Sequence, residues 1–383
     1  MIDILTLHWH SKRLTHAASE WYQDMHQHYQ TVSEWSAWWG FMSEKQISHW
    51  LIIFRMGLHG FSPLTRYRFC DGTVCVWSYL DRLMIHLLMN ILRPTFKHII
   101  SPVCLHLKGP SVVKGITKEI KAALETGQFH YVLRLDMRSY YASIDHRILV
   151  KQVNETFDDP LIQQYLEAII TVGIDCDGII KLPTKGIPRG GALSPFFGAL
   201  YLKPLDEAFE NRENCLFLRY MDDVLILVKT QRQYQRAKKR IFKILRELRL
   251  KLSPHKTWMG KLEREFHFLG VSFDPTRIGQ SKENQTPLVS LHSRSYQRAL
   301  DKLKAMREDA VHPAKMQSYL SRWALWWYSA TGTSYQALIN RWRNYTEDIQ
   351  ANLCWIGSGL LLGTSFDRLN RCFNNTSCLK TVV

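Results

Sequence analysis

Residues 219–228 read RYMDDVLILV and place two carboxylates between two apolar segments. Neighbouring like charges repel, and a plain hairpin turn prefers Asn-Gly or Asp-Gly to Asp222-Asp223. A third aspartate, Asp136, directly follows the apolar run YVLRL. Carboxylate oxygens suit Mg²⁺, and two such ions can hold the attacking and leaving oxygens of a phosphoryl transfer. Strand ends that unite the three aspartates would therefore form a two-metal site, and an ordinary solvated turn is the alternative.

Short strands and helices must position these aspartates. Apolar runs predict strands at 131–135, 215–220 and 224–228, and FHFLGVSF predicts one further strand at 266–273. TRYRF and TVCVW, on either side of Asp71-Gly72, predict a hairpin. Between them, helical patterns are expected at about 81–92, 111–124, 145–172, 194–209, 231–251 and 293–348. This mixture predicts an α+β fold.

Composition narrows the partners and the compartment. The chain has 383 residues, a formal net charge of +16 and a sequence pI of about 9.5. Such an excess favours a nucleic acid partner, although a basic protein without one is the alternative. The eight cysteines form no CxxC pair, the start does not read as a signal peptide, and no apolar run is long enough to span a membrane. We therefore expect reduced thiols, no membrane contact and a cytoplasmic location.

Three further motifs follow in a fixed order: LDMRSYYASIDH, GIPRGGALSPFFGALYLKPLD and LKLSPHKT. With the Asp222-Asp223 motif, they make residues 66–273 resemble the reverse transcriptase family, nearest to its group II intron-like and unclassified, defence-associated bacterial members. The resemblance implies a right-hand polymerase with fingers, palm and thumb. The expected division is a helical N-terminal extension at 1–62, fingers at 63–130 with 146–185, palm at 131–145 and 186–275, a helical thumb at 285–350 and a tail at 351–383.

The resemblance also assigns the chemistry. Asp136 and Asp222 would be the principal metal ligands, Asp223 would support them, and the backbone carbonyl of Met137 would face a metal. Lys256 matches a family lysine that protonates the departing pyrophosphate, which is a general acid's role. For Lys256, a solvated side chain is the alternative. The implied cofactor is Mg²⁺, with Mn²⁺ as a substitute.

Substrate contacts come from the same motifs. Tyr141 matches the bulky residue beneath the sugar that rejects a 2′-hydroxyl, with ordinary core packing as the alternative. Gly190 and Gly191 would lie near the incoming base and the template.

Ser194 would cap the helix that follows, with Pro195 at its first position.

The chain departs from the family pattern in places. Thr73 follows the first hairpin turn, where the family has a basic residue that grips the triphosphate. Arg66, Arg68 and Arg82 are the replacements, either for the triphosphate or for template phosphates. Arg189 stands where most group II-like members have Gln. In the next helix the family has a small residue followed by Asn, and this chain has Gly198-Ala199 there. These differences put ordinary template use in question.

The resemblance therefore predicts an RNA-directed DNA polymerase that adds deoxynucleotides to a DNA or RNA primer on an RNA template. The residues read here include no nuclease, ribonuclease H or integrase signature, and by exclusion the expected use is bacterial antiphage defence. Two alternatives stay open: template-independent or protein-primed DNA synthesis, favoured by Arg189, and a non-catalytic, maturase-like RNA-binding protein. A non-coding RNA or a partner protein is a further expected partner, and the oligomeric state is not predicted.

Overall fold

The structure is a computed structural model that describes residues 16–21, 23, 44–69, 72–107, 112–188, 191–210, 212, 214–278, 288–309, 311 and 313–331. The chain divides into two compact units, which are described separately. The first comprises residues 1–112 and 123–264, and the second comprises 113–122 and 265–383. Helices occur together with sheets whose strand pairs are mostly antiparallel, as expected for the predicted α+β class.

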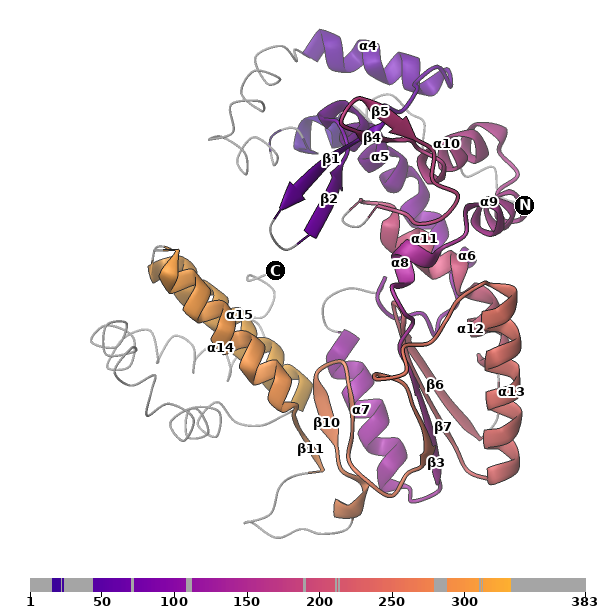
Figure 1. Cartoon of the computed structure of the whole chain (residues 1–383), viewed down its shortest axis with the longest axis vertical. Coiled ribbons are helices and arrows are strands. Elements are labelled where there is room, and N and C mark those ends of the chain that lie inside the picture. The colour runs from indigo at the N-terminus through magenta and orange to yellow at the C-terminus, as the bar shows by residue number, and fades with distance from the viewer. Residues whose placement is uncertain are drawn as a thin grey trace. The chain divides into compact units, whose positions relative to one another are not determined.

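A four-stranded antiparallel sheet forms the centre of the first unit. Its order is β6 (Cys215–Tyr220), β7 (Asp223–Val228), β3 (Tyr131–Leu135) and β8 (Trp258–Lys261). Helices α12 (Lys203–Phe209) and α13 (Gln231–Glu247) pack on this sheet (Figure 1). The apolar residues of β7 are buried, as expected for an inner strand. The three strands predicted from apolar runs are therefore confirmed.

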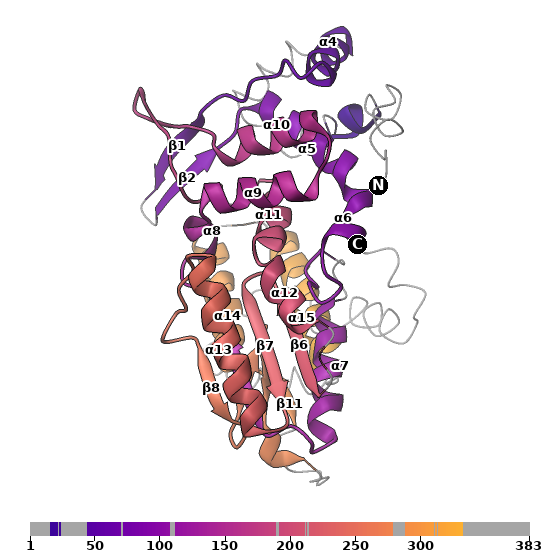
Figure 2. The same cartoon turned by 90° about the vertical axis from the view of Figure 1, so that its right-hand side faces the viewer.

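A second sheet in this unit has the order β2, β1, β4, β5. Strands β1 (Leu64–Phe69) and β2 (Gly72–Val76) form the predicted hairpin. Residues 173–188, for which the sequence shows no regular pattern, contribute β4 (Ile174–Cys176) and β5 (Ile179–Lys181). Strand β4 pairs in parallel with β1, a contact between segments far apart in the chain (Figure 1). Figure 2 shows the β1–β2 hairpin from another side.

The remaining helices of the first unit surround these sheets. They are α4 (Glu44–Arg55), α5 (Tyr79–Leu92), η1 (Arg93–Thr95), α6 (Phe96–Ile99), α8 (Tyr140–Ser143), α9 (His146–Thr156), α10 (Pro160–Ile170) and α11 (Ser194–Tyr201). The expected continuous helix at 145–172 is in fact α9 and α10. It breaks because the Asp159 carboxylate caps a new helix by accepting from the Leu161 and Ile162 N–H groups, with Pro160 at its first turn.

The expected helix at 194–209 is likewise two helices, α11 and α12, joined at Leu202. The prediction that Ser194 caps α11 is wrong. Leu193 precedes the helix and makes no side-chain cap, while the Ser194 hydroxyl donates to the Pro188 carbonyl at 2.6 Å. That hydrogen bond fixes the loop that leads into α11.

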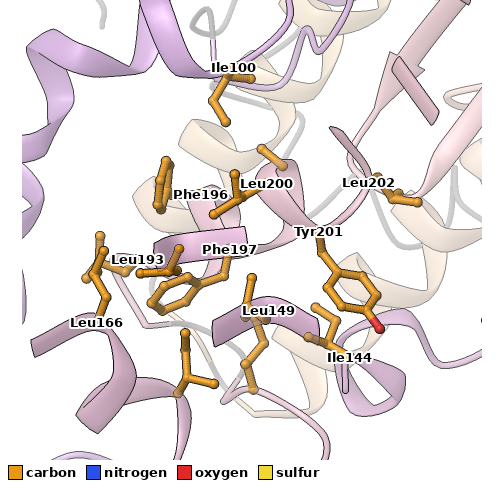
Figure 3. Packing of buried hydrophobic residues seen from close by; sticks show 14 of the residues in the cluster. Ile100, Ile144, Leu149, Leu166, Leu193, Phe196, Phe197, Leu200, Tyr201 and Leu202 are labelled. Carbon is orange, nitrogen blue, oxygen red and sulfur yellow. The ribbon is translucent and has the colours of Figure 1, made fainter. Parts of the chain in front are cut away.

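Helix α11 supplies much of the apolar core of the first unit (Figure 3). Phe196 and Phe197 lie near Leu149 of α9 and Leu166 of α10 in this cluster, and all four side chains are buried. Burying a large apolar side chain stabilises the fold by about 1.5–3 kcal/mol. This core anchors the motif segment that runs from Gly191 into α11.

The second unit contains a three-stranded sheet and long helices. Its sheet is β9 (Phe266–Phe268), β10 (Val271–Phe273) and β11 (Val289–Leu291), with η2 (Pro275–Arg277) after β10. The helices are α14 (Ser293–Glu308), α15 (Pro313–Thr331) and most of α7 (Val112–Glu125). Trp327 of α15 is 1% exposed, so it packs in the core of this unit.

The prediction of a single strand at 266–273 is wrong. Leu269 and Gly270 have φ angles of 49° and 80°, and they turn the chain so that β9 and β10 pair antiparallel. Two consecutive positive φ angles suit a tight hairpin turn, in which Gly is unstrained. The alternation of large apolar residues across the turn concealed it.

The described residues bear on the expectations about membrane spans and cysteines. None of the helices described is long and apolar enough to cross a bilayer. Cys75, Cys104, Cys176 and Cys215 are free thiols. The Trp-rich and His-rich part of the predicted N-terminal extension lies largely outside the described residues, as does the predicted tail at 351–383.

Candidate active site

The central sheet brings Asp136 beside Asp223. Strands β3 and β7 run antiparallel with Leu135 opposite Val224, so the next pair along the ladder is Asp136 and Asp223. Opposite residues of such a pair have Cβ atoms about 4.5–5.5 Å apart. Asp222 lies in the turn between β6 and β7, immediately before Asp223. Strand register therefore gathers three aspartates, distant in sequence, at one end of the sheet.

The electrostatics of Asp223 report this crowding. The pKa of Asp223 is raised to about 6, chiefly by burial and then by the carboxylates of Asp222 and Asp136, while Lys256 and Arg134 act in the opposite direction. Negative charge at this sheet end is thus incompletely neutralised by the protein. Lys256 lies 3.3 Å from Asp136 through its Nζ, and it remains 64% exposed.

The donor set suits a divalent cation, because three hard carboxylates raise one another's energy until a cation neutralises them. Among the residues described, no three Asp, Glu, His or Cys side chains lie close enough together to bind one metal ion. Asp136 instead faces the Lys256 ammonium. This contact involves one of the two carboxylate oxygens of Asp136, Oδ2. The side chain of Met137 is buried, and its backbone forms an isolated antiparallel bridge with Leu252. That Met137 uses its carbonyl as a metal ligand stays a prediction.

The turn that carries Asp222 is held in an uncommon conformation. Met221 has φ +57°, in the left-handed region where non-glycine residues are strained by about 1–3 kcal/mol. Two side chains hold it there. Arg219 donates from Nη1 to the Met221 carbonyl at 3.0 Å, and the Met221 N–H donates to Nδ1 of His106 at 3.2 Å. Side chains therefore hold both the N–H and the carbonyl of Met221, the residue before Asp222, and we call this arrangement the clamp.

Arg219 is itself locked by a buried ion pair. Both Arg219 and Asp206 have fully buried side chains, and Nε of Arg219 donates to Asp206 at 2.6 Å. The Nη2 group bonds the other Asp206 oxygen and also donates to the Ala199 carbonyl at 3.2 Å. Burial alone would lower the pKa of Arg219, but Asp206 more than offsets it, so the guanidinium stays charged. The pair thus connects α11 and α12 to the aspartate turn.

His106 completes the clamp as a neutral ring. Its Nδ1 accepts from Met221, so Nε2 carries the proton and donates to the Pro195 carbonyl at 3.1 Å. The pKa of His106 is lowered to about 4, chiefly by burial and also by Arg219, against the opposing effect of the Pro195 carbonyl. Because its pKa falls on folding, the contribution of His106 to stability is full above the ordinary histidine value and is lost as the pH falls towards 4.

We predict that His106→Phe lowers the free energy of unfolding at pH 7 by about 1–3 kcal/mol, because the Met221 N–H loses its acceptor. The difference between wild type and variant should shrink between pH 6.5 and 4. Denaturant unfolding at several pH values measures both effects. His98→Phe, at an exposed histidine, is the matched control. A pH-independent difference would contradict the assignment of a neutral His106.

Tyr141 lies against Gly198 in the middle of α11. A Cβ on Gly198 would come within 3.3 Å of the Tyr141 hydroxyl and of Tyr140 Cε1, so the glycine at this departure from the family pattern makes room for both rings. The Tyr140 hydroxyl donates to the Gly198 carbonyl at 2.6 Å and is buried, whereas Tyr141 is only half-buried. Tyr140 is therefore the core residue of the pair.

Two of the proposed triphosphate arginines, Arg66 and Arg68, lie on β1 of the second sheet, and Arg82 lies in α5. Arg66 and Arg68 both contact Asp177 of the β4–β5 turn, at 3.0 and 2.9 Å. Arg82 lies with its guanidinium carbon 6.0 Å from the Tyr79 ring centre. Its neighbour Asp81 is 1% exposed and binds His59 at 2.9 Å, so it serves structure. No contact described here brings these arginines to the aspartates.

The glycine-rich motif is described only in part, because Arg189 and Gly190 lie outside the described residues. Gly191 packs closely: a Cβ there would lie 2.9 Å from the Ser194 hydroxyl and 3.5 Å from the Trp77 indole nitrogen. A side chain at this position would displace the loop or the hydroxyl that anchors it.

Sequence reasoning missed the clamp residues. Arg219 carried a usable signal, because a charged residue inside the apolar strand CLFLRY needs a buried partner. Asp206 lies in a helical segment with other acidic residues, and His106 lies in a segment with no regular pattern. Neither could be paired with the aspartate turn without the tertiary structure.

Comparison with known proteins agrees with this geometry. Protein YkfC of Escherichia coli strain K12 is 25% identical over 174 residues, which cover 37% of this chain and 46% of YkfC. Two solved telomerase structures are similar to this chain at lower sequence identity. That of Candida albicans with a fragment of telomeric RNA has 14% identity and a TM-score of 0.45, covering 70% of this chain and 54% of that one. The apo form from Candida tropicalis has 16% identity and a TM-score of 0.39, covering 55% and 44%.

The chain thus spans about half the length of the relatives it matches. The family described as reverse transcriptase (RNA-dependent DNA polymerase) matches residues 72–273, which hold all three aspartates and more than half of the chain. The α+β right-hand polymerase fold expected from the motifs is confirmed. The chain belongs to the reverse transcriptase family.

Proposed function

We propose that the protein is an RNA-directed DNA polymerase that adds deoxynucleotides to a primer 3′ end. The observation that carries the proposal is the β3–β7 register, which places Asp136 beside Asp223 and next to Asp222 within a matched reverse transcriptase segment. Family members of this kind take a nucleic acid substrate, and the net charge of +16 suits one. Template RNA, primer and deoxynucleoside triphosphates are the proposed partners.

Each site residue has a proposed role. Asp136 and Asp222 hold Mg²⁺ or Mn²⁺, with Asp223 beside them and the Met137 carbonyl as an additional ligand. When bound, the ions stabilise the attacking and leaving oxygens of the phosphoryl transfer. Lys256, which is 64% exposed beside Asp136, is the proposed donor of a proton to the departing pyrophosphate.

The remaining proposed contacts are to substrate and template. Arg66 and Arg68 of β1 and Arg82 of α5 bind the triphosphate or template phosphates. Gly190 and Gly191 lie against the incoming base, and Arg189 contacts the template. The residues proposed as fingers, palm and thumb keep the boundaries expected from the sequence.

Primer extension on an RNA template tests the proposal. Purified protein with a DNA primer annealed to RNA should extend the primer in Mg²⁺ with all four deoxynucleotides, and the product should match the template. EDTA should abolish extension because the carboxylates then lack their ions. A long product made from one deoxynucleotide without template would instead support template-independent or protein-primed synthesis, for which Arg189 is the motivation. Absence of any product would contradict polymerase activity.

We predict that Tyr141→Ala raises ribonucleotide incorporation relative to deoxynucleotide incorporation by roughly 10- to 100-fold, the scale of discrimination that one small group provides. The ring that would meet a 2′-hydroxyl is then absent. Competitive single-nucleotide extension measures the ratio. Tyr141→Phe keeps the ring and is the matched control, so it should retain wild-type selectivity. An unchanged ratio in Tyr141→Ala would mean that Tyr141 only packs.

Use in bacterial antiphage defence, in the cytoplasm, is the biological setting we propose. It is supported by the resemblance of residues 66–273 to unclassified bacterial reverse transcriptases. A plaque assay with wild type and Asp222→Ala tests it: protection that requires Asp222 supports a role for the polymer made. Equal protection by both proteins would favour a non-catalytic, maturase-like RNA-binding role.

A further inference from the structure

Helix α13 presents two faces of opposite character. Its inner face buries Ala237, Ile241, Ile244 and Leu245 against the unit that holds the aspartates. Its outer face is polar and exposed. Gln235, Lys238, Lys239, Phe242, Lys243 and Arg246 follow one another at helical spacing and line a depression of about 370 Å³. We call these six residues the α13 outer face.

Positive charge is concentrated on helix α13. Its 17 residues, Gln231–Glu247, hold seven basic side chains and one acidic one, a net charge of +6, while the whole chain has +16. Arg232 and Arg236 are four residues apart, as are Lys239 and Lys243, and like charges at this spacing destabilise a helix. Among the residues described, only Lys243 of this helix has an acidic partner, Glu247 at 3.9 Å. A polyanion bound here would relieve the repulsion.

An aromatic ring lies in the middle of the basic side chains. Phe242 is 47% exposed, although aromatic side chains are usually buried, and it lies between Lys239 and Arg246 on the α13 outer face. A nucleic acid base stacks on such a ring with about 1–3 kcal/mol, and neighbouring cations hold the phosphates. A membrane surface would need more apolar side chains than this one ring.

We propose that the α13 outer face binds single-stranded RNA, with Lys239, Lys243 and Arg246 at the phosphates and Phe242 stacked on an unpaired base. Unpaired bases are the part of an RNA that can reach a protein aromatic ring. The aspartates lie at the ends of β3 and β7 and contribute nothing to this face. The surface is thus a second RNA site, additional to the template site, and it suits an RNA that stays attached while the enzyme copies.

The test uses a fluorescein-labelled single-stranded RNA of about 20 nucleotides, long enough for one such site. The full chain is first saturated with unlabelled template–primer, so that the probe reports on surfaces outside the template site. Wild type is compared with Lys239→Gln/Lys243→Gln/Arg246→Gln. The matched control is Lys97→Gln/Lys151→Gln/Arg55→Gln, which removes the same charge from exposed positions elsewhere. Thermal melting of each variant checks folding.

At about 0.1 M salt, the α13 triple variant should bind the probe at least about tenfold more weakly, and its salt slope should fall by about two, as expected for three lost phosphate contacts on a single strand. The control triple should change affinity less than about twofold. Phe242→Leu should weaken binding roughly five- to tenfold with an unchanged slope, and Phe242→Trp should not. Extension of a short template–primer should persist in all variants.

Three results would overturn the proposal. Equal losses in the two triple variants would show a non-specific charge effect. Equal affinity for DNA of the same sequence would remove the assignment to RNA. Tighter binding to anionic phospholipid vesicles or to a polyglutamate peptide would assign the face to another partner. Failure of primer extension in the wild type would contradict the proposed polymerase function and leave the binding result intact.

Discussion

Asp222→Asn should lower the rate of templated primer extension by at least about 1,000-fold while leaving the fold intact. Removing one carboxylate from the metal site takes away transition-state stabilisation worth several kcal/mol, and each 1.36 kcal/mol is tenfold in rate. Asn keeps the size and turn preference of Asp, so the β6–β7 hairpin should persist. Single-turnover extension with saturating deoxynucleotide measures the rate, and circular dichroism checks the fold.

The matched control for this experiment is Asp145→Asn, at an aspartate that caps α9 and binds Arg249 at 2.7 Å. That variant should lose less than about tenfold, because the aspartate serves structure. The metal dependence adds a second readout: Asp222→Asn should also need more Mg²⁺ or Mn²⁺ for its residual activity. Wild-type rates in Asp222→Asn would refute the proposed two-metal site.

Asp206→Ala should lower the free energy of unfolding by about 3–5 kcal/mol, because it leaves the Arg219 guanidinium buried without its partner. A double variant, Asp206→Leu/Arg219→Met, fills the same space with apolar groups and should recover most of that stability. It should still extend primers at least about tenfold more slowly, because the Met221 carbonyl has lost its donor. Chemical denaturation and single-turnover extension separate the two effects.

Glu207→Gln is the control for the buried pair, since Glu207 and Lys203 form a partly exposed ion pair at 3.8 Å. Such surface pairs contribute about 0–1 kcal/mol, so stability should hardly change. Full activity in the restored double variant would show that Arg219 stabilises the fold without positioning the aspartate turn. Failure of the double variant to recover stability would mean that the space around the pair cannot repack.

The sequence by itself determined the local elements and the chemistry they carry. The strands at 131–135, 215–220 and 224–228 follow from apolar runs, and the hairpin around Asp71-Gly72 follows from its turn residues. The three aspartates, together with the LDMRSYYASIDH, GIPRGGALSPFFGALYLKPLD and LKLSPHKT motifs in their fixed order, predicted the family that the comparison confirms. The predicted helix boundaries were wrong at Pro160 and Leu202, because helix capping and proline interrupt helices there that apolar periodicity alone would continue.

Only the tertiary structure decided which residues hold the aspartate turn in place. The β3–β7 register, the buried pair of Arg219 with Asp206, and the ring of His106 each join segments that are separated along the chain. The hairpin of β9 and β10 likewise depends on two positive φ angles that no apolar pattern reports. Apolar periodicity and turn residues report on positions a few residues apart in the chain. Buried polar groups pair with groups that are close in space, and these contacts form only when distant segments pack together.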